Sequence, residues 1–524
     1  MAVFELVIAL LFGGAVLSGV ARRLSLPYPA LLAVAGAGLA LMPRAPSVAL
    51  DPQLALALFV APVLLDAAFD SSPRDLKENW RPVASLALIA VGLTVVAVAV
   101  VARALVPDLP WAAAVTLGAI VAPPDAAAAT AVLKQLRPPH RLMVILEGES
   151  LFNDASALLI YRTAAAAALT GTFSVARVAP TLVLVCVGSV LLAAVMVRVI
   201  MKLNQVVTDI ATVVILQFIG TFAVWLLAEA MHLSGIITMV VFAILAARSS
   251  NVRARVRIPS YAVWEVVVHV LNVLAFILVG LQLKPIISSL TGQQLAGYLT
   301  TAAAVVAAVV LVRLAWVMCH AMLGHWIDPA SRGRAGHPRP RFAWRSALVV
   351  GWSGMRGIVT LAAALALPAA FPQRGLILFV SFAVVLGTLV IQGSTISPLM
   401  RLFGLEDDGA VTREVRLARE EVARAALSAL DGVPATEHQA LLRRKLQDRL
   451  ERAHRATARA VAGEPPEPSE PPAHLDLLLR TQRAERQTLL ALRARGTIGD
   501  DAFHRVEEEL DWAELNAEGL ARTD

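Results

Sequence analysis

The sequence has 524 residues, of which 58% are hydrophobic and only 16% charged, and its mean hydropathy is +0.70. Soluble domains carry about a quarter charged residues, so this composition excludes a soluble globular protein and predicts one that crosses a membrane many times. The formal charge of +7 reflects basic loops of the kind that orient membrane proteins, so it indicates no nucleic-acid partner. Cys186 and Cys319 both fall in apolar stretches and predict neither a disulfide framework nor a metal site.

The chain begins with an apolar stretch, and the basic pair Arg22 and Arg23 follows it. A cleaved signal peptide has the reverse order, so we expect an uncleaved first span. Crossing a bilayer takes about 20 apolar residues, and about thirteen stretches meet this requirement. They are 2–20, 28–43, 51–69, 82–106, 111–133, 142–169, 175–200, 207–231, 233–248, 259–283, 297–323, 344–369 and 375–401.

Basic residues alternate with these spans, because every second loop is rich in Arg and Lys. The intervening loops offer little beyond Arg44, Arg177, Lys284 and Arg374. Basic loops face the cytoplasm, so we predict an N-terminus outside the cell and a cytoplasmic C-terminal tail. The abundance of Arg and Ala suggests a bacterium with a GC-rich genome, and therefore a multi-pass protein of the bacterial inner membrane.

The character of the chain changes near Leu405, where it becomes rich in Arg and Glu with Ala and Leu at helical spacing. We predict an all-α membrane protein with a transmembrane domain over 1–403 and a cytoplasmic helical tail over 404–524. A Pro/Glu stretch at 464–472 predicts a linker inside the tail, and 500–515 predicts another amphipathic helix. We interpret the tail as a solvated segment for assembly or regulation.

Two of the predicted spans carry residues that break helices. The fifth contains Ala-Pro-Pro-Asp at 122–125, and its prolines remove two backbone donors. The twelfth contains Gly-Trp-Ser-Gly-Met-Arg-Gly at 351–357. The two breaks lie seven spans apart, and this odd offset means that the two spans run in opposite directions, as in an inverted-topology repeat around a midplane binding site. Pro and Gly also give simple kinks or close packing, but Asp125 and Arg356 inside the breaks favour a site.

The sixth span holds Glu-Gly-Glu-Ser-Leu-Phe-Asn-Asp at 147–154, with three acidic side chains in eight residues. An Asp at the centre of a membrane helix costs about 2.5–3.5 kcal/mol, so such groups indicate a partner or an ion path. Ser150 and Asp154 share one helix face, and Glu149 and Asn153 share another about 100° away. Carboxylate, hydroxyl and carbonyl oxygens suit a small hard cation. The same carboxylate can bind a proton instead, which is sufficient for exchange if the site alternates between the two sides.

We therefore predict that Asp154 and Asp125 form a transient monovalent-cation and proton site, with Ser150 as a supporting ligand. Asn153 is expected to hold the geometry through hydrogen bonds. The alternative for all of these positions is a polar network that only fixes helix packing.

Glu149 and Arg356 are predicted to form an ion pair between the sixth and twelfth spans, because either charge alone would be costly in the membrane. Asp66 is either a ligand at the entrance or an interfacial acid, and the sequence leaves both open. Snorkelling or hydrogen bonds between helices explain further polar residues near the spans, namely Arg103, Arg162, Glu229, Glu265, His269, Asn272 and Arg313.

These motifs resemble those of the monovalent cation:proton antiporter-1 family, the sodium/proton exchangers. Glu-Ser-Leu-Phe-Asn-Asp at 149–154 matches the signature of the family's sixth helix. Gly-Met-Arg-Gly at 354–357 and Ala-Pro-Pro-Asp at 122–125 are similar to its arginine motif and its fifth-helix motif. Segments 228–235 and 271–283 also resemble the family, and the resemblance covers roughly residues 1–400.

The resemblance implies thirteen helices, a six-helix core domain that moves against a dimerisation domain, and a homodimer. It makes Asp154 the ion-binding acid, Asp125 the acid of the unwound fifth helix and Asp66 a third-helix acid near the ion. Glu149 and Arg356 would be its ion pair.

Two features bear on stoichiometry and ion choice. Asn153 before Asp154 resembles the branch of the family that is electroneutral, exchanging one cation for one proton. The family usually has Thr before the fifth-helix Asp and Pro after it, whereas Pro124 and Ala126 stand here. Pro124 supplies no hydroxyl ligand, so the choice among sodium, potassium and lithium is open.

The sequence thus predicts a sodium/proton antiporter, with a potassium/proton antiporter as the alternative that nothing in the sequence separates from it. Its expected partners are the cation, the proton and the lipid bilayer, and we expect no cofactor and no enzymatic activity. An intramembrane aspartyl protease built on Asp125 and Asp154 would need a Gly-x-Gly-Asp segment, which the sequence lacks. A channel would need a pore loop or charged ring, and no filter sequence is evident.

Overall fold

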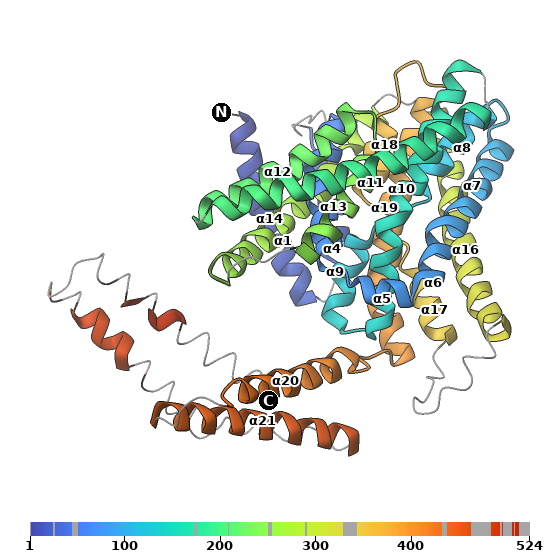
Figure 1. The fold of residues 1–524 in the computed structure, drawn as a ribbon. Coiled ribbons are helices and arrows are strands. Elements are labelled where there is room, and N and C mark those ends of the chain that lie inside the picture. The colour runs from blue at the N-terminus through green and yellow to red at the C-terminus, as the bar shows by residue number, and fades with distance from the viewer. Residues whose placement is uncertain are drawn as a thin grey trace. The chain divides into compact units, whose positions relative to one another are not determined.

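The computed structural model describes residues 2–24, 27–43, 51–171, 175–207, 209–249, 254–288, 291–327, 343–431, 437–462 and short pieces from 481 to 512. The chain divides into two compact units, Met1–Asp408 and Gly409–Asp524. Within the described residues the secondary structure is helical, without strands (Figure 1). The predicted linker at 464–472 and most of the predicted helix at 500–515 lie outside the described residues.

The helices of the first unit follow the predicted spans to within a few residues. In chain order they are α1 (Ala2–Leu24), α2 (Tyr28–Ala40), α3 (Pro52–Ala55), the π-helical η1 (Leu56–Val60), α4 (Ala61–Asp70), α5 (Pro73–Glu78), α6 (Trp80–Ala84), the π-helical η2 (Ser85–Ala90), α7 (Val91–Leu105), α8 (Trp111–Val121), α9 (Ala126–Leu136), α10 (His140–Thr170), α11 (Val175–Val206), α12 (Ile210–Ala230), α13 (Gly235–Ser249), α14 (Ala254–Leu281), α15 (Leu283–Ile287), α16 (Gly292–Ile327), α17 (Ala343–Trp352), α18 (Ile358–Leu365) and α19 (Arg374–Phe403). Eight helical segments in the described ranges are long and apolar enough to cross a membrane.

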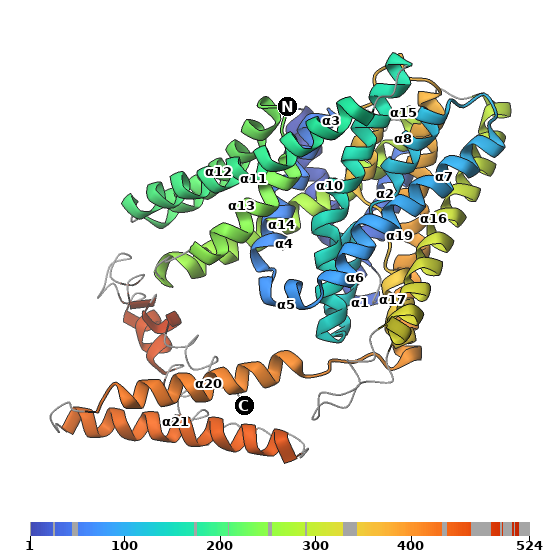
Figure 2. The ribbon, with the colours of Figure 1, turned by 45° about the vertical axis from the view of Figure 1, so that its right-hand side comes forward.

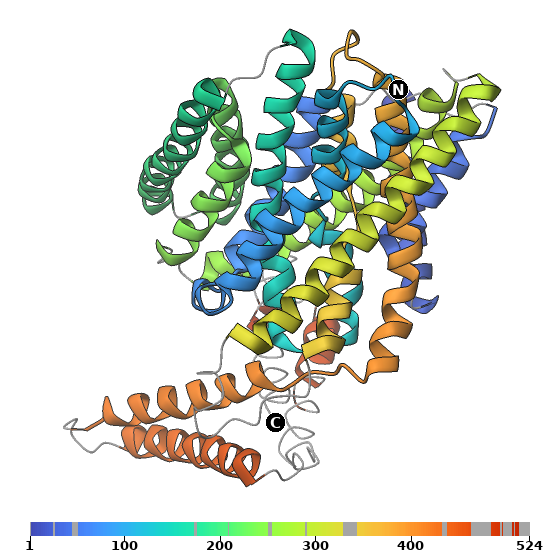
Figure 3. The same ribbon diagram turned by 90° about the vertical axis from the view of Figure 1, so that its right-hand side faces the viewer.

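These helices form two groups. In one group α7 packs on α8 and α16, α10 packs on α8, and α16 packs on α17 and α19. In the other group α14 packs on α2 and α1, while α13 packs on α4, α11 and α12. Figure 2 shows α12, α13 and α14 on one side of the unit and α7, α16 and α17 on the other, and Figure 3 gives the view at a right angle to Figure 1. We call the first of these sets of helices the α8–α10 group and the second the α11–α14 group.

Close backbone contacts hold each group together. A Cβ atom at Gly36 of α2 would overlap the carbonyl oxygen of Ile277 in α14, and one at Gly280 would overlap the backbone of α2. In the other group a Cβ atom at Gly118 would lie 2.6 Å from the carbonyl oxygen of Val95. Helices in lipid gain little from the hydrophobic effect, so small residues that allow such contact fix their packing.

The second unit contains two helices that pack against each other, α20 (Ala410–Ser428) and α21 (Glu437–Ala462). Glu420 of α20 contacts Arg424 at 2.8 Å within its own helix and His454 of α21 at 3.2 Å. The Arg/Glu-rich sequence therefore forms helices here, as its periodicity predicts.

The short helix α5 joins the two groups on one side of the unit, and Asp75 ties it to the start of α10. His140 Nε2 lies 3.1 Å from Asp75 Oδ2, and the side chain of Ser72 caps the helix by accepting from the backbone N–H of Asp75. Burial raises the pKa of Asp75, but the hydrogen bonds with His140, Ser72 and Arg74 outweigh it and hold this pKa below its ordinary value.

We expect Asp75→Asn to destabilise the protein by about 1 kcal/mol near neutral pH, the size of a partly exposed charged contact. Because the folded pKa is lowered, the contribution of Asp75 is present above its unfolded pKa of about 3.9 and is lost as the pH falls through the folded value. Thermal unfolding in detergent should show two melting temperatures that converge as the pH is lowered from about 6 to about 3. A gap that stays constant over this range would contradict the assignment.

Candidate functional site

Both predicted breaks are present, and they contact each other. Residues 122–125 separate α8 from α9, and residues 353–357 separate α17 from α18. The backbone N–H of Asp125 in the first break donates to the carbonyl oxygen of Met355 in the second, at 2.6 Å. Two unwound segments, far apart in the sequence, therefore meet at one place inside the first unit.

Two buried arginines satisfy the carbonyl groups that the breaks leave open. Arg356 donates to the carbonyl oxygens of Val121 (2.9 Å) and Ala122 (3.1 Å) at the end of α8, and to that of Gly354. Arg313 of α16 donates in the same way to the end of α17, at Val350 and Gly351, both at 3.2 Å. A cation at a helix C-terminus also complements the helix dipole. Each broken helix thus has an arginine at the end of its first half.

The predicted ion pair between Glu149 and Arg356 is wrong, because the structure pairs Glu149 with Arg313. Both oxygens of Glu149 accept from the Arg313 guanidinium, one of them from Nη2 at 2.7 Å. The two side chains are only 1% and 3% exposed. The guanidinium of Arg356 is instead directed to backbone carbonyls. Arg313 therefore does not snorkel to the membrane surface as the sequence suggested.

Asp125 lies where the second half of the other broken helix begins. A Cβ atom at Gly357, which precedes α18, would overlap the carboxylate of Asp125. The N-terminal end of a helix carries partial positive charge, which favours a nearby carboxylate. Glycine at this position therefore leaves the space that the acid fills.

Asn153 connects α10 to the first break. Its Nδ2 donates to the carbonyl oxygen of Pro124 at 2.9 Å, and the residue is fully buried. This is the position expected of a residue that holds the geometry of the break. Asp154 follows it and is 8% exposed.

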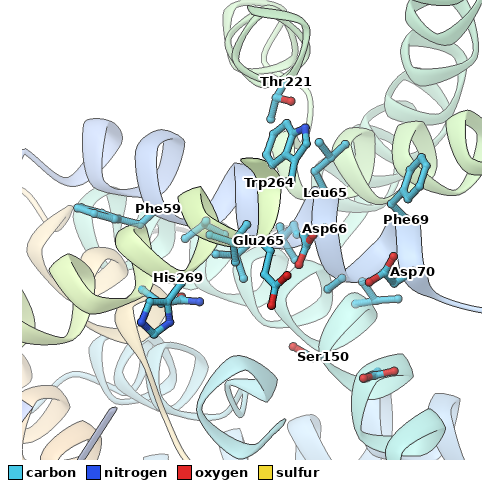
Figure 4. A pocket seen from close by; sticks show the side chains of 18 of the residues that line it. Phe59, Leu65, Asp66, Phe69, Asp70, Ser150, Thr221, Trp264, Glu265 and His269 are labelled. Atoms are coloured by element: carbon cyan, nitrogen blue, oxygen red, sulfur yellow. The ribbon is translucent and has the colours of Figure 1, made fainter. Parts of the chain in front are cut away.

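A cavity of about 770 Å³ reaches this site between the two groups of helices. Its wall includes all four predicted ligand residues, Asp66, Asp125, Ser150 and Asp154. Figure 4 shows the side chains that gather around the space, among them Asp66 and Ser150. Asp66 therefore lies in the wall of the same cavity as Asp125, Ser150 and Asp154.

The cavity wall also contains charged and polar residues that the sequence did not single out as site residues. Glu147 lies on the face of α10 that carries Ser150 and Asp154. The other polar wall residues include Asp70, Lys134, Glu265, His269 and Asn272. Their spacing in the sequence could have predicted a shared polar face. Residues 66 and 70, residues 147, 150 and 154, and residues 265, 269 and 272 are each three or four positions apart and so lie on one face of a helix.

The cavity is lined by carboxylates without a closed metal centre. Among the residues that the structure describes, no group of three or more His, Cys, Asp or Glu side chains is placed to hold a metal ion.

Two broken helices that meet at an acid-lined cavity in an apolar helical unit are typical of a secondary transporter. The family model for the transmembrane part of sodium/hydrogen exchangers matches residues 6–402. The chain belongs to this family of monovalent cation:proton antiporters, which confirms the predicted resemblance. Members of this family are transporters rather than enzymes.

Individual relatives agree with this assignment. An uncharacterised Na⁺/H⁺ exchanger of Mycobacterium tuberculosis is 30% identical, and the alignment covers 98% of this chain and 96% of that protein. A sodium, potassium, lithium and rubidium/H⁺ antiporter of Bacillus subtilis is also 30% identical, over 70% of this chain and 56% of that protein. The solved sodium proton antiporter of Methanocaldococcus jannaschii has the same fold, with a TM-score of 0.60 and 20% identity over 77% of this chain and 98% of its own.

Proposed function

We propose that this protein exchanges Na⁺ or another monovalent cation for protons by alternating access. Cation and proton compete for the site formed by Asp154 and Asp125, with Ser150 as a supporting ligand. Asp66 lies on the route of the cation to this site. The observation that carries the proposal is the position of Asp154, which is 8% exposed and lines the same cavity as Asp125.

Electrostatics favours exchange at such a site. Two charged carboxylates in the wall of one cavity repel each other, and the apolar unit offers little solvation to unpaired charge. Either a bound cation or a bound proton relieves this repulsion, so the site needs only one of the two at a time. An ion that leaves is therefore replaced by the other species, which is the requirement for antiport.

The transported ion is proposed to be sodium, with potassium as the second candidate. Pro124 brings no hydroxyl to the site, so the donors are carboxylates, Ser150 and backbone carbonyls. Such oxygen ligands suit hard cations in general. The relative in Bacillus subtilis is named for sodium, potassium, lithium and rubidium, which supports testing all of these ions.

We further propose thirteen membrane crossings, built from inverted repeats, with the N-terminus outside and the second unit in the cytoplasm. The two broken helices, each with an arginine at the end of its first half, support the repeat. The α8–α10 group would move against the α11–α14 group, and a homodimer is proposed from the family resemblance. The proposed exchange is electroneutral, so an imposed membrane potential should leave its rate unchanged.

We expect Asp154→Asn to abolish cation-dependent proton movement, because the amide can neither release a proton nor neutralise a cation. Everted vesicles loaded with a pH-sensitive dye should show dequenching on addition of sodium, potassium or lithium with the wild type and none with the variant. Asp108→Asn, which changes an exposed acid in the loop between α7 and α8, is the matched control and should transport normally. Exchange by Asp154→Asn at the full rate would refute the assignment of the site, and silence of the wild type from about pH 6 to 9 would refute antiport.

A further inference from the structure

An ion pair joins the two groups of helices on the side of Asp154 that faces away from the cavity. Arg162 of α10 lies 3.2 Å from both carboxylate oxygens of Glu229 in the last turn of α12. Glu229 also accepts from the backbone N–H of Gly235 at the start of α13, at 3.4 Å. One partner therefore belongs to the helix that carries the ion site, and the other is anchored where two helices of the second group meet.

The helix ends show that this pair and the cavity opening lie on opposite sides. The cavity wall includes Asp70 at the end of α4, Lys134 near the end of α9 and Arg257 near the start of α14. Along α10 the wall runs from Glu147 to Asp154. Arg162 follows Asp154 by eight residues, which is about 12 Å along a helix.

One face of α10 connects the cavity to the ion pair. Glu147, Ser150, Asp154, Leu158 and Arg162 succeed one another at spacings of three or four residues, so they form one stripe. The stripe is polar inside the cavity, becomes apolar at Leu158, which packs against the core, and ends in the ion pair. The path from the site to the far side is thus closed by a layer of packing followed by a charged contact.

We propose that Arg162 and Glu229 form the contact that closes this far side, and that the pair separates when Asp154 becomes accessible from there. The inference rests on the proposed alternating access. In the structure the two groups of helices touch at this pair, while the cavity lies open on the other side. A contact that forms in only one access state would be found in this arrangement. An ordinary surface pair, by contrast, would leave the balance of states unchanged.

The effect on the two access states should be modest and measurable. The side chains are 42% and 41% exposed, so water weakens the attraction. Loss of such a pair should shift the balance between the states about two- to fivefold, which corresponds to about 0.4–1 kcal/mol.

The test measures access to a cysteine placed between the site and the pair. Cys186 and Cys319 are first changed to Ser, and Leu158→Cys then places a thiol on the stripe. A membrane-impermeant maleimide is added to right-side-out and to everted vesicles, and the labelling rate is measured for the full chain. We expect Arg162→Glu and Glu229→Arg each to raise labelling from the far side two- to fivefold, and the exchanged pair Arg162→Glu/Glu229→Arg to restore the original rate.

The two single variants also control for local electrostatics. A nearby negative charge suppresses the thiolate and a positive charge favours it, so a local effect would move the two labelling rates in opposite directions. Arg198→Glu is a matched reversal, since the hydrogen bond that Arg198 donates within the described part of the chain goes to the carbonyl oxygen of Ala194 in its own helix. Unchanged labelling in the single variants, failure of the exchanged pair to restore it, or an equal rise in Arg198→Glu would overturn the proposal. Labelling needs no transport, so the expected pattern in a protein that moves no cation would refute only the proposed function.

Discussion

Arg313→Met is expected to destabilise the protein by about 3–5 kcal/mol, because it leaves the Glu149 carboxylate buried without its partner. Glu149 is 1% exposed and Arg313 3% exposed, and the pair is bidentate. The substitution also removes the donors to Val350 and Gly351 at the end of α17. Thermal unfolding of the purified protein in detergent should show a large fall in melting temperature or a loss of folded protein. The exposed pair offers the matched control, since Arg162→Met should cost about 1 kcal/mol or less.

A double-mutant cycle separates the observed pairing from the one that the sequence suggested. If Arg313 is the partner of Glu149, Glu149→Leu/Arg313→Met should be more stable than either single variant, since an apolar pair of similar volume can replace a buried ion pair. Glu149→Leu should show little such recovery when combined with Arg356→Met. A stronger coupling of Glu149 to Arg356 than to Arg313 would show that the pairing in the structure is incorrect.

Gly357→Ala is expected to lower the rate of cation-dependent proton movement at least tenfold, equivalent to about 1.4 kcal/mol in the barrier. The backbone of Gly357 is extended, with φ −136° and ψ −151°, so alanine can adopt it. The added Cβ atom would instead occupy the space of the Asp125 carboxylate and displace it from the beginning of α18. Dequenching of a pH-sensitive dye in everted vesicles measures the effect.

Gly92→Ala is the control for this substitution. Gly92 lies in α7 of the same helix group, and a Cβ atom there meets no other atom within 4 Å. We expect it to transport like the wild type. Normal exchange by Gly357→Ala would show that the placement of Asp125 against this glycine is not needed for transport.

The positions of the helices and of the breaks could be predicted from the sequence. A membrane helix must satisfy its own backbone hydrogen bonds, so each apolar stretch of sufficient length predicts a membrane-spanning helix. Prolines cannot donate such bonds, so the Ala-Pro-Pro-Asp run at 122–125 predicted a break that is present. Asp154, Asp125 and Ser150 could be predicted as a group for the same local reason, since charges in apolar sequence are costly without a purpose.

The partner of Glu149 could not be predicted in this way. Arg313 and Arg356 are both arginines in apolar sequence. The cost of burying the Glu149 carboxylate predicts that one of them pairs with it but does not say which. The sequence favoured the arginine inside a break, but that arginine donates to the carbonyl oxygens at the end of α8. Likewise, snorkelling or hydrogen bonds between helices explained Glu265 and His269 in the sequence, whereas the packing of α14 beside α4 and α18 places them in the cavity wall.

The sequence by itself determined the class of the protein, its apolar helices and its two breaks, and it selected Asp125 and Asp154 as acids of the candidate site. These follow from local rules, because the cost of each polar group in lipid depends on its immediate neighbours along the helix. Only the tertiary structure decided which arginine pairs with Glu149, which acids share the cavity, and that Arg162 meets Glu229 beyond the site. Those contacts join helices distant in the sequence, and their choice depends on the relative rotation and depth of whole helices, which helical periodicity leaves open.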